Sequence, residues 1–572
     1  MAYLSLRPWY RRYKYIMASV VDFHHPSLGV VRGLASASIN QFLGIQYATL
    51  AGKWDPPILS EKVTTPLDAT KLGPTTVSPP NGIEIEFGQI QKALPVPDLQ
   101  QSETECLNLN ITTPADATPG SNLPVIVFLH GGGFAIGSNA WPQYDLKRIV
   151  ALSAAEKRPV IGVNINYRLG IFGFLTSQEL ESQGYQSNNG LHDQRTALLW
   201  IRKNISGFGG DPEQITIVGE SAGGVSATHH LQSEVPLFKR LISMGGTNLL
   251  MPPLPQQVAE STYKAIVDRL GLGALSLSER VKALVQIDTE KIVTAVRPGD
   301  PVMPTLGGAL NLKGYTYTEI HQGTAGQLDL PGRTWCQEIM IGDCQFDASS
   351  LEVPNDYSAD SYGTTLQASI LTLMINRSTE GIAVAFRQSL TRSLGSSEKA
   401  DRVLSAYGIT EDIPDSDTFS GILKFANDIA FFVPVFNYAH CWSGQAFMYQ
   451  FNEPNVWDGP WKGRANHILD VAYLFQNYNE HLPEPQRRVA VQFGKDLIAF
   501  ASGHAPWAAF KWETGDLYSR VYGGRVPGTS GTIITVQGPE PRTERSKTIF
   551  DLAAIVPADE LSRAWGSFMA GF

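Results

Sequence analysis

The stretch GESAGG, residues 219–224, encloses a single serine, Ser221, between small residues. It follows QITIVGE (214–220), which is apolar enough for a buried strand, and precedes VSATHHLQ (225–232), which we expect to be helical. A G-x-S-x-G pattern at such a junction is typical of a sharp turn that exposes a serine hydroxyl, because larger side chains in place of the glycines would collide with the strand and the helix. The alternative is a glycine-rich turn whose serine has no catalytic role.

The segments around this turn predict an α/β fold. PVIVFLH (124–130) and PVIGVNIN (159–166) are continuous apolar runs, as expected for strands covered on both faces. Residues 188–205 place apolar side chains on one stripe of a helix. Two further strands and a helix are expected at 338–343, 446–451 and 486–503. This alternation predicts a large, mostly parallel central sheet flanked by helices.

The composition is that of a globular protein and excludes several classes. Of 572 residues, 43% are hydrophobic and 17% are charged, and the net charge of −9 argues against nucleic-acid binding. We expect no membrane span, because no apolar run is long enough. The four cysteines form no C-x-x-C pair, so we expect no metal site and no disulfide framework. These cysteines are Cys106, Cys336, Cys344 and Cys441.

We expect residues 1–23 to be a disordered N-terminal extension and residues 24–572 to form one catalytic domain. Two regions fit no regular pattern, and we interpret them as long loop insertions near 70–104 and 250–335. The N-terminus has no apolar core of the kind that a secretory signal needs, so a cytoplasmic location is expected. Its basic residues leave a mitochondrial presequence as the alternative.

A serine hydroxyl is a weak nucleophile that needs a general base, and that base needs an orienting acid. His229 and His230 lie in the helix after the turn and cannot reach back to its tip. His467 stands in GRANHILDVAYLF, a loop that enters a helix downstream of a strand. From this pattern it is a candidate base, and the other later histidines stay open: His321, His440, His481 and His504.

Acyl transfer also needs backbone N–H groups that face the developing oxyanion. HGGGF, residues 130–134, directly follows the apolar strand at 124–129. Its three glycines allow a substrate to approach the backbone. The N–H group of Ala222 would complete this set of donors, the oxyanion hole. A plain flexible loop is the alternative.

Several longer segments resemble the type-B carboxylesterase and lipase family, which includes cholinesterases and fungal lipases, and the fungal members most of all. They are QFLGIQYA (41–48), ECLNLNI (105–111), NYRLGIFGFL (166–175) and the block at 188–224, within a resemblance that covers roughly residues 24–515. The resemblance implies an α/β-hydrolase fold with long loop insertions.

The same resemblance implies a role for individual residues. Ser221 matches the nucleophile and His467 the base. Asp347, in IGDCQFDASSL (341–351), matches the orienting acid, where the family often has glutamate, and Asp343 is its rival.

In the glycine loop the match assigns the oxyanion donors to Gly132 and Gly133, together with Ala222. Glu220 matches a residue that lines the pocket, and Arg168 with Asp193 matches a structural pair.

We therefore expect a serine carboxylic-ester hydrolase that acts on a small-molecule ester through an acyl-enzyme, with no cofactor and no metal. The alternatives are an acyltransferase or transesterase, a lipase or sterol esterase, and a non-catalytic binding module. The products formed with an acyl acceptor present would identify a transferase, and activation at a lipid–water interface would identify a lipase. The presence of the full triad argues against a non-catalytic module.

Overall fold

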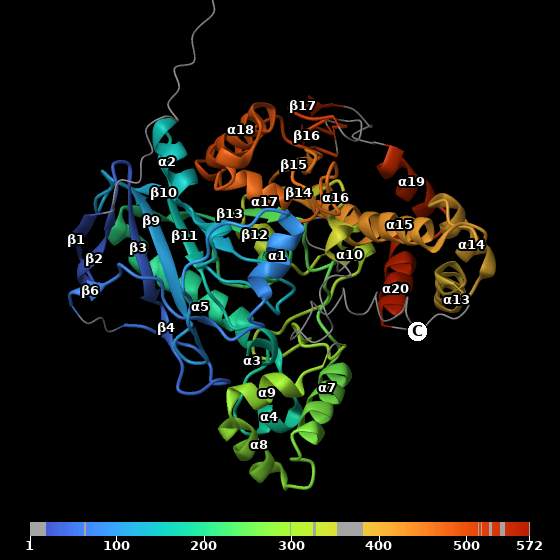
Figure 1. Ribbon diagram of the computed structural model, residues 1–572, viewed down its shortest axis with the longest axis horizontal. Helices are drawn as coiled ribbons and strands as arrows, with labels where there is room; N and C mark the ends of the chain where they lie inside the picture. The colour runs from blue at the N-terminus through green and yellow to red at the C-terminus, as the bar shows by residue number, and fades with distance from the viewer. Residues whose placement is uncertain are drawn as a thin grey trace, which may run out of the picture.

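The computed structural model describes residues 19–61, 65–297, 299–323, 328–351, 381–512, 514–515, 517–524, 529–537 and 544–570. Within these residues a 13-stranded sheet has the order β1-β2-β3-β9-β11-β10-β12-β13-β14-β15-β16-β17, with β6 beside β2. Helices cover both sides of this sheet (Figure 1). The expected α/β architecture is confirmed.

Seven strands that are consecutive in the sheet, β11-β10-β12-β13-β14-β15-β16, are parallel. The strands β1, β2, β3 and β9 on one side and β17 on the other pair antiparallel, and the short β6 pairs parallel with β2. The strands outside the parallel part on one side are β1 (Ser19–His25), β2 (Gly29–Ala35), β3 (Ile39–Gln46), β6 (Leu67–Asp68) and β9 (Asn108–Pro114). The others are β10 (Leu123–Leu129), β11 (Ile161–Ile165), β12 (Gly210–Glu220), β13 (Arg240–Met244), β14 (Glu338–Cys344), β15 (Gln445–Phe451), β16 (Ser519–Tyr522) and β17 (Ile533–Val536).

The apolar runs in these strands are explained by burial on both faces. In β10, Val125, Val127 and Leu129 pack into one hydrophobic cluster, whereas Ile126 and Phe128 pack into another. Successive side chains of a strand point to opposite faces. The two clusters therefore lie on the two sides of the sheet, and neither face of β10 is left to solvent.

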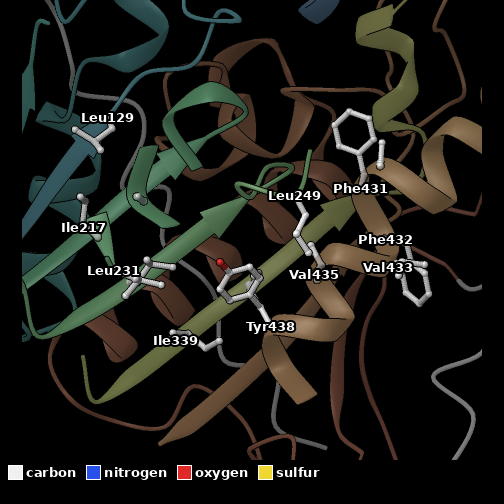
Figure 2. Close-up of a cluster of buried hydrophobic side chains, with 14 of the residues drawn as sticks. Leu129, Ile217, Leu231, Leu249, Ile339, Phe431, Phe432, Val433, Val435 and Tyr438 are labelled. Atoms are coloured by element: carbon white, nitrogen blue, oxygen red, sulfur yellow. The ribbon is translucent and has the colours of Figure 1, made fainter. Parts of the chain in front are cut away.

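Figure 2 shows one of these faces, where Leu129, Ile217 and Ile339 come from the strands and Val435 and Tyr438 from the helix above them. That helix is α16 (Val433–Cys441), and α5 (Asn189–Asn204) contributes to the same cluster. The opposite face is covered by α2 (Lys147–Ala155), α17 (Leu469–Leu474) and α18 (Glu484–Ala501).

Most of the elements expected from periodicity are present with small boundary shifts. The expected helices at 188–205 and 486–503 are α5 and α18. The prediction that the disordered extension reaches residue 23 is wrong for residues 19–23. These residues belong to strand β1, which begins at Ser19 and pairs with β2 along its whole length. Residues 1–18 lie outside the described residues.

The two expected insertions contain short elements of their own. Residues 70–104 include helix α1 (Gly82–Ile90). Residues 250–335 include α7 (Gln256–Arg269), α8 (Leu277–Gln286) and α9 (Thr289–Ala295), which with α4 (Gln178–Ser182) bury a separate hydrophobic cluster. These four helices form a group at the bottom of the view, away from the sheet (Figure 1).

One helical stretch, Asp415–Cys441, is long and apolar enough to span a membrane by length and composition. It consists of α15 (Asp415–Ala426), a π-helical turn η5 (Asn427–Phe432) and α16. In its most apolar window, 83% is buried inside the protein. Its apolar character is thus accounted for by packing in the core, against the sheet face of Figure 2.

Arg168 and Asp193, the structural pair that the family resemblance implies, lie fully buried beside the sheet. Arg168 donates from Nε and Nη2 to the two carboxylate oxygens of Asp193, at 2.8 and 2.7 Å. Nη1 donates to the backbone carbonyls of Lys53 and Asp55 at 3.1 and 2.8 Å. Both charges are therefore satisfied, and the expected pairing is confirmed.

Removing one partner of this pair should destabilise the fold strongly. Asp193→Ala leaves a buried guanidinium without its counter-charge, which typically costs about 3–5 kcal/mol of unfolding free energy. Urea unfolding followed by tryptophan fluorescence measures the loss. As a matched control, Asp401→Ala removes the partner of Arg387 on the surface and should barely move the transition. Equal effects of the two variants would contradict this interpretation.

Candidate active site

The serine turn has the backbone that its sequence predicts. Ser221 lies between β12 and helix α6 (Ala222–His230) with φ 51° and ψ −121°, a conformation that side chains rarely adopt. Its N–H group donates to the Met244 carbonyl at 2.9 Å. A Cβ at Gly219 would lie 2.2 Å from the Gly223 carbonyl oxygen, and one at Gly223 would lie 2.1 Å from that of Leu129. The glycines are thus required by close packing around the serine.

His467 and Asp347 are joined by a short hydrogen bond. Nδ1 of His467 lies 2.7 Å from Oδ1 of Asp347, and the two side chains are 8% and 1% exposed. The other oxygen, Oδ2, accepts from the backbone N–H of Cys344 at 2.7 Å. The His467 backbone N–H donates to Oγ of Ser349 at 2.9 Å. Both members of the pair are therefore fixed by further contacts.

Two glycines after β13 connect this pair to the serine turn. A Cβ at Gly245 would lie 3.0 Å from Oδ1 of Asp347, and a Cβ at Gly246 would lie 2.2 Å from the carbonyl oxygen of Ser221. The turn after β13 thus packs against Asp347 on one side and Ser221 on the other. Residues expected from three distant segments meet at the carboxyl end of the parallel strands.

The side chain of Glu220, the residue before the serine, lies beside the imidazole of His467. Its Oε1 lies 3.2 Å from Nε2 of His467, in ion-pair range but without hydrogen-bond geometry. Within the described residues the Ser221 hydroxyl forms no hydrogen bond, so it is not bonded to Nε2 of His467. Catalytic hydrogen bonds in unliganded sites are often long and tighten only with substrate bound.

The glycine loop lies directly against this cluster. A Cβ at Gly131 would lie 2.2 Å from Oε2 of Glu220 and 2.9 Å from Cβ of Ser221. Gly132 and Gly133 have φ values of 93° and 60°, which favour glycine. Within the described part of the chain, the N–H groups of Gly132, Gly133 and Ala222 donate to no acceptor. Unpaired donors next to a serine can bind an oxyanion.

The charges around His467 are unusually concentrated. Burial by itself would lower the pKa of His467, but the negative charges of Glu220, Asp347 and Asp470 raise it to about 9. Burial raises the pKa of Glu220 well above its usual range, although the charge of His467 opposes this. Glu220 and His467 therefore compete for one proton in a buried space.

Two further acids, neither of them predicted from the sequence, are buried in the site. Asp470 is buried, accepts from the Tyr449 hydroxyl at 2.9 Å, and has its pKa raised to about 6 by burial and then by Asp347. Glu86 in α1 is buried, accepts from Gln143 at 2.8 Å, and has its pKa raised by burial to about 7. The spacing in HILD, three residues from His467 to Asp470, was the available signal for the first. Nothing local indicated the second.

The rival candidates lie elsewhere. Asp343 is buried inside β14 and is not the partner of His467. His321 hydrogen-bonds to Asn437 and stacks on His440. All four cysteines are buried free thiols. Within the described residues, no group of three or more His, Cys, Asp or Glu side chains could hold a metal ion.

A family model described as the carboxylesterase family matches residues 19–517. The chain belongs to the carboxylesterase family. The expected resemblance is therefore confirmed, and with it the α/β-hydrolase fold that a large, mostly parallel sheet flanked by helices indicates.

Individual carboxylesterase-family proteins resemble this chain over different lengths. The para-nitrobenzyl esterase of Bacillus subtilis is 36% identical over 252 residues, which are 43% of this chain and 47% of that protein. That match thus spans about half of the relative's length. Lipase 3 of Yarrowia lipolytica is 26% identical over 499 residues, 82% of this chain and 86% of that protein. A solved PNB esterase structure has a TM-score of 0.69 at 25% identity and covers 93% of this chain and 99% of its own.

Replacing Glu220 should change the proton affinity of His467. Glu220→Gln removes a negative charge 3.2 Å from Nε2, so the pKa of His467 should fall below its value of about 9. Histidine-selective NMR titration measures it. Glu480→Gln, which removes a surface carboxylate paired with Arg148, is the control and should leave this pKa in place. An unchanged pKa in Glu220→Gln would show that the carboxylate does not act on the ring.

Proposed function

We propose that the chain is a serine carboxylic-ester hydrolase with Ser221 as nucleophile, His467 as base and Asp347 as the orienting acid. The observation that carries the proposal is the buried 2.7 Å hydrogen bond between His467 and Asp347, beside the strained serine turn. The named esterase and lipase relatives support the same reaction class.

In the first half of the reaction, the Ser221 hydroxyl rotates toward Nε2 of His467, gives up its proton and attacks the ester carbonyl. The carbonyl oxygen becomes an oxyanion that accepts from the unpaired N–H groups of Gly132, Gly133 and Ala222. Asp347 holds Nδ1–H and stabilises the imidazolium. Collapse of the tetrahedral intermediate breaks the ester bond, and His467 gives its proton to the leaving alcohol.

In the second half, water enters and loses a proton to His467 as it attacks the acyl-enzyme. As the second tetrahedral intermediate collapses, His467 returns this proton to the leaving Oγ of Ser221, and the carboxylic acid is released. Throughout, Glu220 stays within reach of Nε2. We infer that its carboxylate stabilises the imidazolium that forms in each half of the reaction, because its charge raises the pKa of His467.

Replacing the nucleophile tests this function directly. Ser221→Ala should lower the kcat for para-nitrophenyl acetate by about 10⁶-fold, because the members of a triad act as a unit. The far-ultraviolet circular dichroism and the melting temperature should be retained. Ser182→Ala, which removes an exposed hydroxyl of α4, is the matched control and should keep full activity. Turnover by Ser221→Ala close to wild type would end the proposal.

The pH dependence gives a second test. Because neighbouring carboxylates raise the pKa of His467 to about 9, the ring is protonated below that pH and cannot accept the serine proton. The kcat/KM should therefore fall as the pH drops through about 9, and Glu220→Gln should move this acid limb to lower pH. Initial rates with a stable ester across the alkaline range measure both. A limb that Glu220→Gln moves to higher pH would contradict the assignment.

A further inference from the structure

A π-helical turn lies beside the candidate acid–base pair. Helix α15, the turn η5 and helix α16 form one continuous helical stretch, Asp415–Cys441. At the end of η5 the N–H group of Val433 donates to the carbonyl of Asp428, five residues earlier. Such turns are rare in proteins and occur frequently at functional sites. Here the turn contacts the loops that carry Asp347 and His467.

Pro434 accounts for the change of bonding at this point of the helix. Proline has no N–H group, and its ring collides with a carbonyl of the preceding turn, so it interrupts a regular helix. The next bond of the π pattern would join residue 434 to the carbonyl of Ile429. The hydroxyl of Tyr317 replaces the missing donor and binds that carbonyl at 2.7 Å. The turn is therefore encoded by the sequence and held by a tertiary contact.

The side chain of Asn427, the first residue of η5, binds the backbone around Asp347. Asp347 begins the short 3-10 helix η4 (Asp347–Leu351), and N–H groups in the first turn of a helix lack partners within it. Oδ1 of Asn427 accepts from the N–H group of Ala348 at 3.1 Å, and Nδ2 donates to the carbonyl of Gln345 at 3.4 Å. Asn427 is 1% exposed. One buried amide thus holds the chain on both sides of Asp347.

The same turn also contacts the other member of the pair. Phe431 is four residues after Asn427, and residues four apart lie on one face of a helix. Its ring packs edge-to-face against the ring of His467, with the centroids 5.7 Å apart. Phe432 leaves the turn in a different direction (Figure 2) and packs against Phe550. One face of η5 therefore supports both Asp347 and His467.

The backbone at Asp347 sets the direction of the catalytic hydrogen bond. Oδ1 of Asp347 meets Nδ1 of His467 at 2.7 Å, while Oδ2 accepts from the N–H group of Cys344. This bond fixes the tautomer of the imidazole and the direction of its Nε2. A shift of the Asp347 turn would therefore turn Nε2 away from the serine.

We propose that Asn427 is a positioning residue for ester hydrolysis: its amide fixes the turn that bears Asp347 and, through it, the orientation of His467. The inference rests on the proposed function, in which Asp347 orients His467. The two hydrogen bonds of Asn427 go to backbone groups beside Asp347, and the residue acts through them. It should therefore govern the rate of the chemical step and not the binding of the ester.

Steady-state kinetics of Asn427→Ala with para-nitrophenyl acetate test this role. The kcat should fall about 10-fold or more, because misplacing a group at the reacting centre by about 1 Å can cost about 100-fold in rate. The KM should stay close to that of wild type, since the oxyanion loop is unchanged. Asn427→Asp keeps an oxygen in the place of Oδ1 and should recover most of the kcat at its own pH optimum.

Asn437→Ala is the matched control. Asn437 is also buried, lies about 15 Å further along the same helix at about 1.5 Å per residue, and makes one donor and one acceptor bond. Its partners are the Tyr317 carbonyl and Nδ1 of His321. This variant should lose stability as Asn427→Ala does, but its kcat should remain that of wild type.

Proton NMR of the Nδ1–H group of His467 gives a readout that needs no substrate. A proton in a short bond between an imidazole and a carboxylate resonates far downfield of ordinary N–H groups. The resonance should be shifted or lost in Asn427→Ala, and it should keep its wild-type position in Asn437→Ala. A purely structural role of Asn427 would not move it.

The inference is overturned if Asn427→Ala, shown to be folded by circular dichroism and thermal melting, keeps the wild-type kcat or leaves the resonance in place. A raised KM with an unchanged kcat, or an Asn427→Asp variant no faster than Asn427→Ala, would overturn it too. If Asn427→Ala does not fold, Asn427→Ser, whose oxygen is too short to reach Ala348, is judged by the same criteria. Wild-type protein that fails to hydrolyse the ester would refute the proposed function, and the resonance would still decide whether Asn427 fixes the pair.

Discussion

The proposed chemistry depends on the hydrogen bond between His467 and Asp347, which joins residues 120 positions apart in the chain. The parallel sheet makes that contact possible. Strands that run side by side in one direction bring the loops after their carboxyl ends to a single edge, which is where ligands bind in open α/β sheets. The serine turn follows β12, the glycine loop follows β10, and Asp347 follows β14. Each is held there by close backbone packing around glycines.

The cost of this convergence is electrostatic. Glu86, Glu220, Asp347 and Asp470 are all buried around one histidine. In a medium of low dielectric, several neighbouring carboxyl groups cannot all remain charged, so the pKa of some must rise. Burial raises those of Glu86, Glu220 and Asp470, and the remaining negative charge draws a proton to His467. The protonation state of the site therefore belongs to the cluster as a whole.

The sequence predicted the fold class and the serine turn well, because both follow from local patterns. Apolar runs at 124–130 and 214–220 give buried strands, and glycines around Ser221 are demanded by contacts of about 2 Å. The residues alone did not single out His467, since the choice among histidines depends on long-range folding. The family resemblance supplied it. Glu86 was missed because α1 reaches the site only through tertiary packing, and β1 because its partner is another edge strand.

The central claim is that the Ser221 hydroxyl is the group that becomes acylated, and covalent trapping tests it most directly. Incubation with a fluorophosphonate, followed by intact-mass measurement and peptide mapping, counts the reactive hydroxyls and locates them. We expect a single adduct per chain, on Ser221, which forms more slowly when His467→Ala removes the base. No adduct on the wild-type chain, or an adduct on a different residue, would contradict it.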